Sequence, residues 1–218
     1  MTPFKLLQRS PMLRPYLLAA FVVSAVLLPL GSHAAPGNDT LPQFEYSANT
    51  STPVIEYTLN HEMLAEPDAE PLLRVYGNGR VHVHVPVYMK NAGDYELQLN
   101  RNELDTLVSS LSRDGVIDFD HAATRENLRR LNAQRRATTG TLWEVSDVTE
   151  TVIEVNLDRY QRNPASTPVN GLKKRFSWKS LQMDAKRYPE STAIQGAAAS
   201  ARRLHAVIQH PDLKRFGQ

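Results

Sequence analysis

The chain has 218 residues, with 25 basic and 23 acidic side chains and no cysteine. Without cysteine it has no disulfide, no lipid-modified cysteine, and no thiolate to serve as a nucleophile or metal ligand. The near balance of charge excludes binding to a polyanion through net charge alone, and the length suits one domain rather than two.

The first 34 residues have the layout of a secretory signal peptide. Basic residues without acidic companions precede an apolar run: Lys5, Arg9 and Arg14, then residues 16–30. This run is shorter than the about 20 residues that a membrane-spanning helix needs, so we expect a cleaved signal rather than an uncleaved anchor. Cleavage is expected after Ala34 rather than Ala35, and Met12 is an alternative start. The sequence therefore predicts export to the periplasm or the medium.

Residues 35–53 are rich in Pro, Asn, Ser and Thr, which predicts a flexible linker before a single domain at 54–213 and a tail at 214–218. Charge is divided unevenly after the signal. Residues 35–120 carry 14 acidic and 5 basic side chains, whereas residues 121–218 carry 17 basic and 9 acidic ones. Either neighbouring elements of one fold neutralise each other, or a basic face meets an anionic partner.

Four strands are predicted in the first part of the domain. The first covers residues 54–59, and the second and third form a hairpin around Gly77-Asn78-Gly79, whose residues accept the positive φ of a tight turn. In the third strand, valines at 81, 83 and 85 alternate with Arg80, His82 and His84, as in a strand with one buried face. The segment DYELQL at 94–99 alternates in the same way and predicts the fourth strand.

Two helices are expected next. Asn100 and Glu103 have the spacing of a capping box, and the following apolar residues recur at helical spacing until Gly115. Asp120 is expected to cap a second helix, which has few apolar positions and many arginines, so that much of its surface should be solvated.

The rest of the domain is predicted to contain three strands, of which the last two form a hairpin, and a helix. Strands are expected at Thr141 to Val145 and at TVIEVNL (151–157), the latter paired with LKKRFSW (172–178). A long helix opening at Pro189 ends near His210 and presents a stripe of small residues that can approach a sheet closely. The order β-β-β-β-α-α-β-β-α predicts an α+β fold with a mostly antiparallel sheet and helices packed on one face.

The segments YGNGRV (76–81), GDYELQL (93–99) and DGVIDFD (114–120) resemble exported Gram-negative envelope proteins of unknown function. More distantly, the chain is similar to small lipoprotein-type domains with the same order of strands and helices. The resemblance implies an envelope location. It brings no reaction and no catalytic residues.

His82 and His84 are the strongest chemical signal. Residues two apart on a strand project from the same face, so these imidazoles have the spacing of two ligands of a zinc site. A further ligand would come from a neighbouring strand, with His61, Asp94 and Glu96 as candidates. The alternative is a pair of solvent-facing residues opposite the core valines.

Other catalytic motifs are incomplete. His61-Glu62 begins like the zinc helix H-E-x-x-H, but Ala65 stands where the second histidine is required, and no G-x-S-x-G elbow is present. The leading interpretation is therefore a non-catalytic exported module for binding or envelope interaction, without a cofactor. The alternative is a metal-assisted hydrolase organised around His82 and His84.

The expected interaction surface is basic and consists of Arg125, Arg129, Arg130, Lys173, Lys174 and Arg175. Its expected partner is an envelope protein, a glycan or an anionic surface. Export argues against nucleic acid, and membrane contact is expected only through the signal segment before cleavage.

Overall fold

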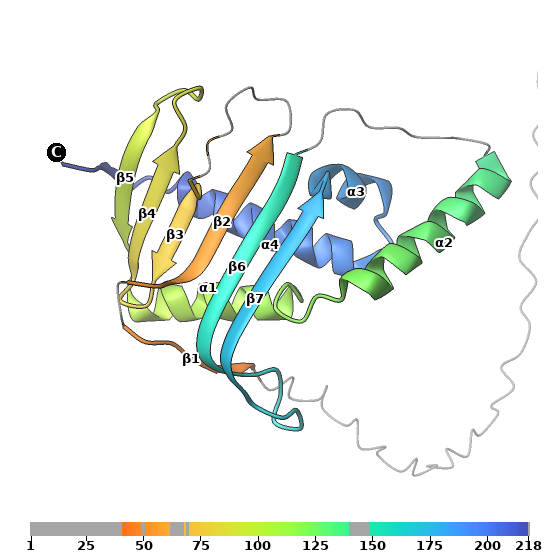
Figure 1. The fold of residues 1–218 in the computed structure, drawn as a ribbon, viewed down its shortest axis with the longest axis horizontal. Helices are drawn as coiled ribbons and strands as arrows, with labels where there is room; N and C mark the ends of the chain where they lie inside the picture. Colours follow the sequence, from red (N-terminus) through yellow and green to blue (C-terminus); the bar gives the residue numbers. More distant parts are fainter. Residues whose placement is uncertain (1–40, 49–50, 62–67, 69, 140–148, 218) are drawn as a thin grey trace, which may run out of the picture. The chain divides into compact units, whose positions relative to one another are not determined.

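The structure is a computed structural model that describes residues 41–48, 51–61, 68, 70–139 and 149–217 (Figure 1). The predicted signal segment, its predicted cleavage point and the strand predicted at 141–145 lie outside the described residues. Within the described part, no helix is long and apolar enough to cross a membrane.

Eight strands and four helices make up the described chain, and the strands form one sheet. In chain order they are β1 (Gln43–Glu45), β2 (Pro53–His61), β3 (Leu73–Tyr76), β4 (Arg80–Val85), β5 (Gly93–Gln98), α1 (Arg101–Arg113), α2 (His121–Thr139), β6 (Thr149–Gln161), β7 (Val169–Lys179), α3 (Leu181–Arg187), α4 (Thr192–Ile208) and β8 (Lys214–Arg215).

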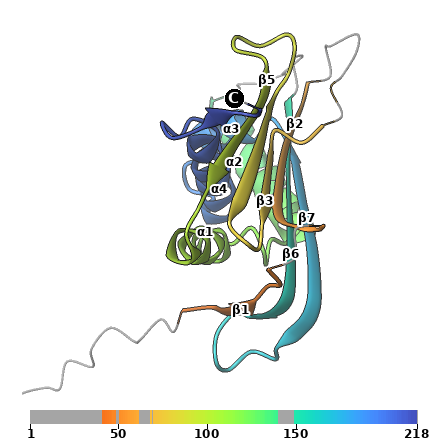
Figure 2. The same cartoon turned by 90° about the vertical axis from the view of Figure 1, so that its left-hand side faces the viewer.

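Every pair of neighbouring strands is antiparallel. β6 pairs with β7 on one edge, while its other edge pairs with β2 and, farther along, with β1. From β2 the sheet continues through β3, β4 and β5 to β8. Helices α1, α3 and α4 lie on one side of this sheet (Figure 2). The predicted α+β class and the antiparallel sheet are confirmed.

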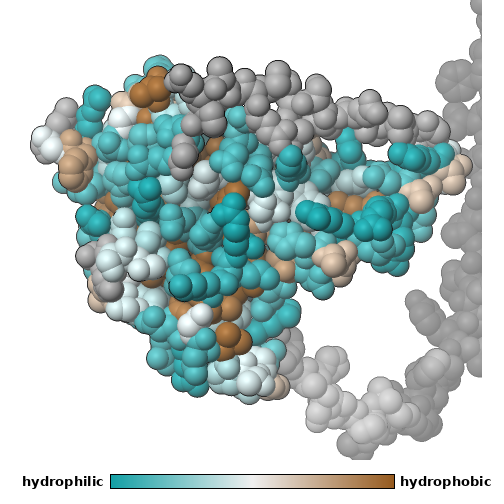
Figure 3. Space-filling view, in the orientation of Figure 1, coloured by the Kyte–Doolittle hydropathy of each residue, from teal (hydrophilic) through white to brown (hydrophobic). Residues whose placement is uncertain are grey.

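The core lies between the sheet and these helices. Inward strand residues such as Leu73, Val75, Val81 and Val83 are fully buried, as the alternation along each strand predicts. α1 buries its predicted stripe, and its capping box is present, because Asn100 accepts from the Glu103 amide and Glu103 accepts in return. The opposite face of the sheet is dominated by hydrophilic residues (Figure 3).

α4 approaches α1 closely through Gly196. A Cβ atom at this position would lie 2.0 Å from the backbone oxygen of Asp114, so only glycine fits without movement of the backbone. Ala197, Ala198 and Ala201 on the same helix are buried. The stripe of small residues thus sets how near α4 lies to its neighbours.

The flexible-linker prediction is wrong for residues 43–46. β1 pairs with the end of β6, and the buried Tyr46 donates a hydrogen bond from its hydroxyl to Oδ1 of Asp105 (2.5 Å). Burial of this ring, together with the cation–π contact of Arg101 at 4.1 Å, holds the segment on the domain. The predicted tail likewise contains β8, which pairs with β5.

Candidate functional site

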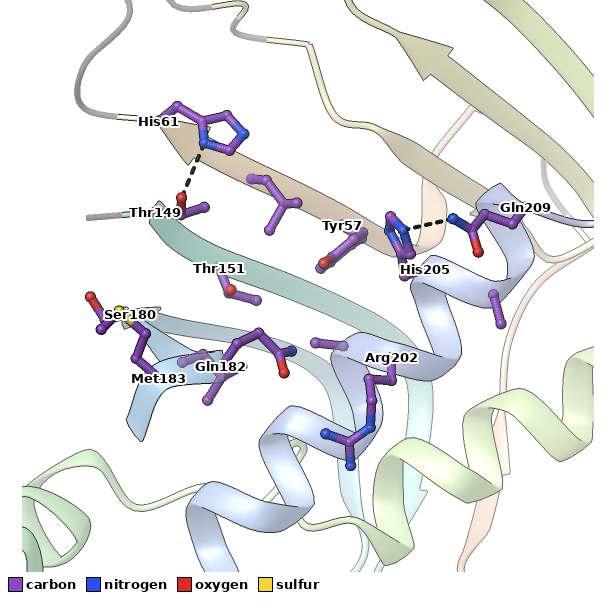
Figure 4. Close-up of a pocket in the computed structure, with 14 residues that line it drawn as sticks. Tyr57, His61, Thr149, Thr151, Ser180, Gln182, Met183, Arg202, His205 and Gln209 are labelled. Atoms are coloured by element: carbon purple, nitrogen blue, oxygen red, sulfur yellow. Dashed lines mark hydrogen bonds between the residues drawn. The ribbon is translucent and has the colours of Figure 1, made fainter. Parts of the chain in front are cut away.

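A groove opens between the inner face of the sheet and the helices α3 and α4 (Figure 4). It encloses about 490 Å³, which lies within the roughly 300–1,000 Å³ that ligand pockets typically have. The register of the sheet builds one wall, because Tyr57, Leu59 and His61 of β2 lie beside Ile153, Thr151 and Thr149 of β6.

The opposite wall comes from the helices. α3 contributes Leu181 and Met183, and α4 contributes Ala201 and Ala206. Alanine side chains fill little space, so this part of α4 leaves the sheet partly uncovered. The accessible surface of the groove is therefore mostly apolar, as is usual for sites that bind organic ligands, although Ser180 and Gln182 also line this wall.

Two hydroxyl groups lie on the sheet side of this apolar space. Tyr57 is 3% exposed and Thr151 is 4% exposed, and both line the groove (Figure 4). Neither side chain has a hydrogen-bond partner within the described part of the chain. Burial raises the pKa of Tyr57 to about 12, so its hydroxyl is neutral at ordinary pH and acts as a hydrogen-bond donor or acceptor.

Polar residues of α4 form one rim of the groove. Arg202, His205 and Gln209 recur at helical spacing, and Nε2 of Gln209 lies 3.1 Å from Nε2 of His205. In this contact the side-chain amide of Gln209 donates to a ring nitrogen of His205 that carries no hydrogen. Arg202 is exposed and extends from the helix without a carboxylate partner among the described residues (Figure 4).

His61 forms the rim at the end of β2. Its Nδ1 atom lies 3.1 Å from Oγ1 of Thr149, and its ring meets that of Tyr88 edge to face, with centroids 6.4 Å apart. Tyr88 belongs to the turn between β4 and β5, where Val87 is also exposed. This end of the groove therefore combines a histidine with exposed apolar side chains.

The predicted metal pair lies on the other face of the sheet. His84 is held between two carboxylates, with Nδ1 2.8 Å from Asp94 and Nε2 2.9 Å from Asp68. Burial opposes its protonation, but hydrogen bonds to Asp94 and Asp68, with the nearby charge of Glu70, raise its pKa overall. A ring that donates through both nitrogens is an imidazolium without a lone pair for a metal.

The candidate further ligands do not complete a metal site. Asp94 lies 3.4 Å from Nε2 of His82, whereas His61 is on the groove side of the sheet and Glu96 pairs with His82 only through strand register. No group of three His, Asp or Glu side chains among the described residues is arranged to hold a metal ion.

His82 belongs instead to a row of ionisable residues that crosses the outer face, one from each strand except β1. In register order the row is Arg175, Glu154, Glu56, Arg74, His82, Glu96 and Lys214. Burial and the adjacent charge of Glu154 raise the pKa of Glu56, while Arg74 opposes this shift from 3.8 Å away. Cross-strand pairing of opposite charges stabilises neighbouring strands in such a row.

The predicted basic surface is divided in the structure. Successive strand residues point to opposite faces, so Lys173 and Arg175 lie on the outer face while Lys174 donates to the backbone oxygen of Phe119 at 3.0 Å. Arg175 pairs with Glu154 across the strands.

The arginines of α2 have their own contacts. Arg129 pairs with Glu126 at 2.8 Å, Arg130 contacts Asn127, and Arg125 lies 5.8 Å from the ring centre of Trp178. Burial, with Lys174 and Arg125 nearby, lowers the pKa of His121. The six residues therefore do not form one basic face. Three of them lie on α2, and the three on β7 point to opposite sides of the sheet.

Four groove residues were not predicted from the sequence as functional: Tyr57, Thr151, Arg202 and His205. Two signals were present: a threonine at an inward position of an otherwise apolar strand, and polar residues at helical spacing beside the small residues of α4.

Comparisons of the chain with models of protein families, with curated proteins and with solved structures found no match. The resemblance to exported envelope proteins therefore stays a prediction. No family supplies residue roles for this chain.

Proposed function

We propose that this chain is an exported, non-catalytic binding domain and that its ligand occupies the groove between β2, β6, α3 and α4. The basic and apolar N-terminal segment supports export. The observation that carries the binding function is that Tyr57 and Thr151, whose hydroxyls have no protein partner among the described residues, face a largely apolar hollow of suitable size. A molecule that covers these hydroxyls removes their water, at a cost of roughly 1–3 kcal/mol for each one left unsatisfied, so a ligand that hydrogen-bonds to both is favoured.

Binding is favoured over catalysis by the arrangement of the histidines. His61 is within hydrogen-bond distance of Thr149, but no carboxylate among the described residues orients its ring as a catalytic base requires. His205 contacts an amide, and His84 is hydrogen-bonded to two carboxylates on the other face. The metal-assisted hydrolase at His82 and His84 therefore has little support from the geometry.

The test is a variant that fills the groove. Ala206 lines the groove and is exposed, so Ala206→Trp adds a large side chain there with little effect on the core. Ala133→Trp on α2 is the matched control, since Ala133 is also an exposed helical alanine and does not line the groove.

Both variants and the wild-type chain would be purified natively after export and analysed by native mass spectrometry, followed by a thermal-shift screen of small organic compounds. We expect a bound compound or stabilising ligands for the wild type and Ala133→Trp, and their loss in Ala206→Trp. Equal ligand binding by all three proteins would show that the groove is not the site.

A further inference from the structure

We infer that the groove takes a free amphipathic anion, namely a single acyl chain that carries an internal carbonyl group and a terminal carboxylate. This assignment rests on the proposed binding function and specifies the chemistry of its ligand. It follows from three properties of the lining, taken from the centre of the groove to its rim.

The first property is the apolar wall. Leu59, Leu181, Met183, Ala201 and Ala206 present hydrocarbon and thioether surface to the same space. Removal of apolar surface from water drives association with such a wall, and the flexible Met183 adapts to a chain of variable shape. An acyl chain fits this part of the groove, because a sugar or a nucleotide would place polar groups against these five apolar side chains.

The second property is the pair of hydroxyls at Tyr57 and Thr151. A plain hydrocarbon lying over them would remove water from both groups and provide no replacement hydrogen bond. A carbonyl oxygen accepts from either hydroxyl. The ligand therefore needs an amide or ester group in the chain at this depth.

The third property is the charge at the rim. None of the described lining residues is acidic, and Arg202 is the one that is charged at all ordinary pH values. Because Arg202 also lacks a carboxylate partner in the described chain, its guanidinium is available for a carboxylate of the ligand. A cationic ligand would meet repulsion at this rim without an acid to offset it.

Three probes of matched chain length separate these contributions. N-dodecanoylglycine has the chain, the amide carbonyl and the carboxylate, whereas N-dodecanoylethanolamine lacks the negative charge and N-dodecanoylethylenediamine carries a positive charge beside the same amide. Titration calorimetry below the micelle concentrations would give the three affinities. We expect the glycine conjugate to bind on the order of 5-fold more tightly than the neutral amide, because a partly exposed ion pair contributes modestly, and the cation to bind most weakly.

Arg202→Gln should reduce the affinity for N-dodecanoylglycine to that for the neutral amide and leave the neutral amide unchanged. The matched control is Arg203→Gln, since Arg203 is the exposed neighbouring arginine and pairs with Asp114 at 3.1 Å rather than lining the groove. This control should retain the preference for the anion.

The outcomes separate the ligand class from the binding function. If the three probes bound with equal affinity and Ala206→Trp abolished the binding of all three, the preference for an anionic ligand would be wrong. Ligand binding in the groove would still be supported. Failure of N-dodecanoylglycine to bind would also overturn the assignment, and probe binding that Ala206→Trp does not change would overturn the groove itself. If the protein sedimented with phosphatidylglycerol vesicles, the proposal of a free ligand would be wrong, and a lipid within the membrane would be the favoured ligand.

Discussion

The Nε2 atom of His84 lies 2.9 Å from Oδ2 of Asp68, and this contact joins the segment between β2 and β3 to the outer face of β4. Asp94 of β5 accepts from the other ring nitrogen at 2.8 Å. Glu70 and His82 also face this cluster, and Arg74 neutralises Glu70 from 2.7 Å. The imidazolium of His84 thus connects three parts of the chain.

This cluster predicts that stability depends on pH. The pKa of His84 is raised in the folded state, so its contribution is complete below about pH 6.5 and is lost as pH rises through the folded pKa. The pKa of Asp68 is lowered, chiefly by the hydrogen bond to His84, so its contribution is present above about pH 3.9 and is lost as pH falls through its folded pKa. The pair therefore stabilises the fold most between about pH 4 and pH 6.5.

His84→Gln should lower the free energy of unfolding by about 1 kcal/mol at pH 5.5 and by less at pH 8, because the group is partly solvated. Urea denaturation at the two pH values would measure the difference. His82→Gln is the control, since the one carboxylate paired with His82 among the described residues is Asp94, at the longer distance of 3.4 Å. If His84→Gln lowered the free energy of unfolding equally at both pH values, a protonated His84 between Asp68 and Asp94 would be contradicted.

A second prediction concerns the segment expected to be a flexible linker. Tyr46→Phe removes the hydrogen bond to Asp105 but keeps the buried ring, so it should cost about 1 kcal/mol of unfolding free energy. Phe44→Tyr is a suitable control, because it adds a hydroxyl at a partly buried position of β1 and removes no contact. If urea denaturation showed Tyr46→Phe to be as stable as the wild type, residues 43–46 would not unfold together with the rest of the domain.

The sequence predicted the features that depend on neighbouring residues. Alternation along β4 and helical spacing in α1 identified which side chains are buried, and Asn100 with Glu103 identified the helix start. β1 was missed because its partner lies far along the chain: Glu45 pairs with Arg159, 114 positions later. Only three residues of β1 pair in this way, too few to leave a pattern in the sequence.

The groove and the short α3 were missed for a related reason. Tyr57 and Ala206 come together only once α4 lies on the sheet, and no spacing rule connects a strand residue to a helix residue so distant. α3 has seven residues, and Trp178 fixes it by donating from Nε1 to Asp184 at 2.8 Å. Such contacts depend on the finished fold rather than on local preference.

A third prediction separates close packing from backbone strain. Gly196→Ala places a Cβ atom 2.0 Å from the Asp114 oxygen, so it should destabilise the protein by about 2–3 kcal/mol despite the better helix propensity of alanine. Gly115→Ala has open space around the new methyl group but a φ of 81°, and it should cost about 1 kcal/mol. Thermal unfolding of both variants tests the order, and a smaller loss for Gly196→Ala would contradict close contact between α4 and α1.

A fourth prediction concerns export. When the full chain is produced in a Gram-negative host, the protein recovered from the periplasm should begin at Ala35, because small residues precede the expected cut. Ala34→Arg should block cleavage and leave the longer chain in the membrane fraction, while Gly37→Arg, behind the cut, should have no such effect. N-terminal sequencing and intact mass would measure this, and a periplasmic chain that retains residues 1–34 would contradict a cleaved signal.

The last prediction tests whether the hydroxyl of Tyr57 serves ligand binding rather than the stability of the fold. Tyr57→Phe keeps the ring in place and removes an unpartnered hydroxyl, so without ligand it should leave stability unchanged or raise it by up to about 1 kcal/mol. The same variant should bind N-dodecanoylglycine more weakly, because the carbonyl loses a donor. Tyr188→Phe is the matched control, since the hydroxyl of this equally buried tyrosine donates to Asn132 at 2.5 Å.

Tyr188→Phe should therefore lose about 1 kcal/mol in urea denaturation without ligand, in contrast to Tyr57→Phe. Weaker ligand binding without a loss of stability is the expected result for a hydroxyl that faces the groove and has no protein partner among the described residues. If Tyr57→Phe instead destabilised the protein as much as Tyr188→Phe, its hydroxyl would have a partner in the free protein. The groove would then offer no unmet hydrogen bond to a ligand, and the binding proposal would lose its main support.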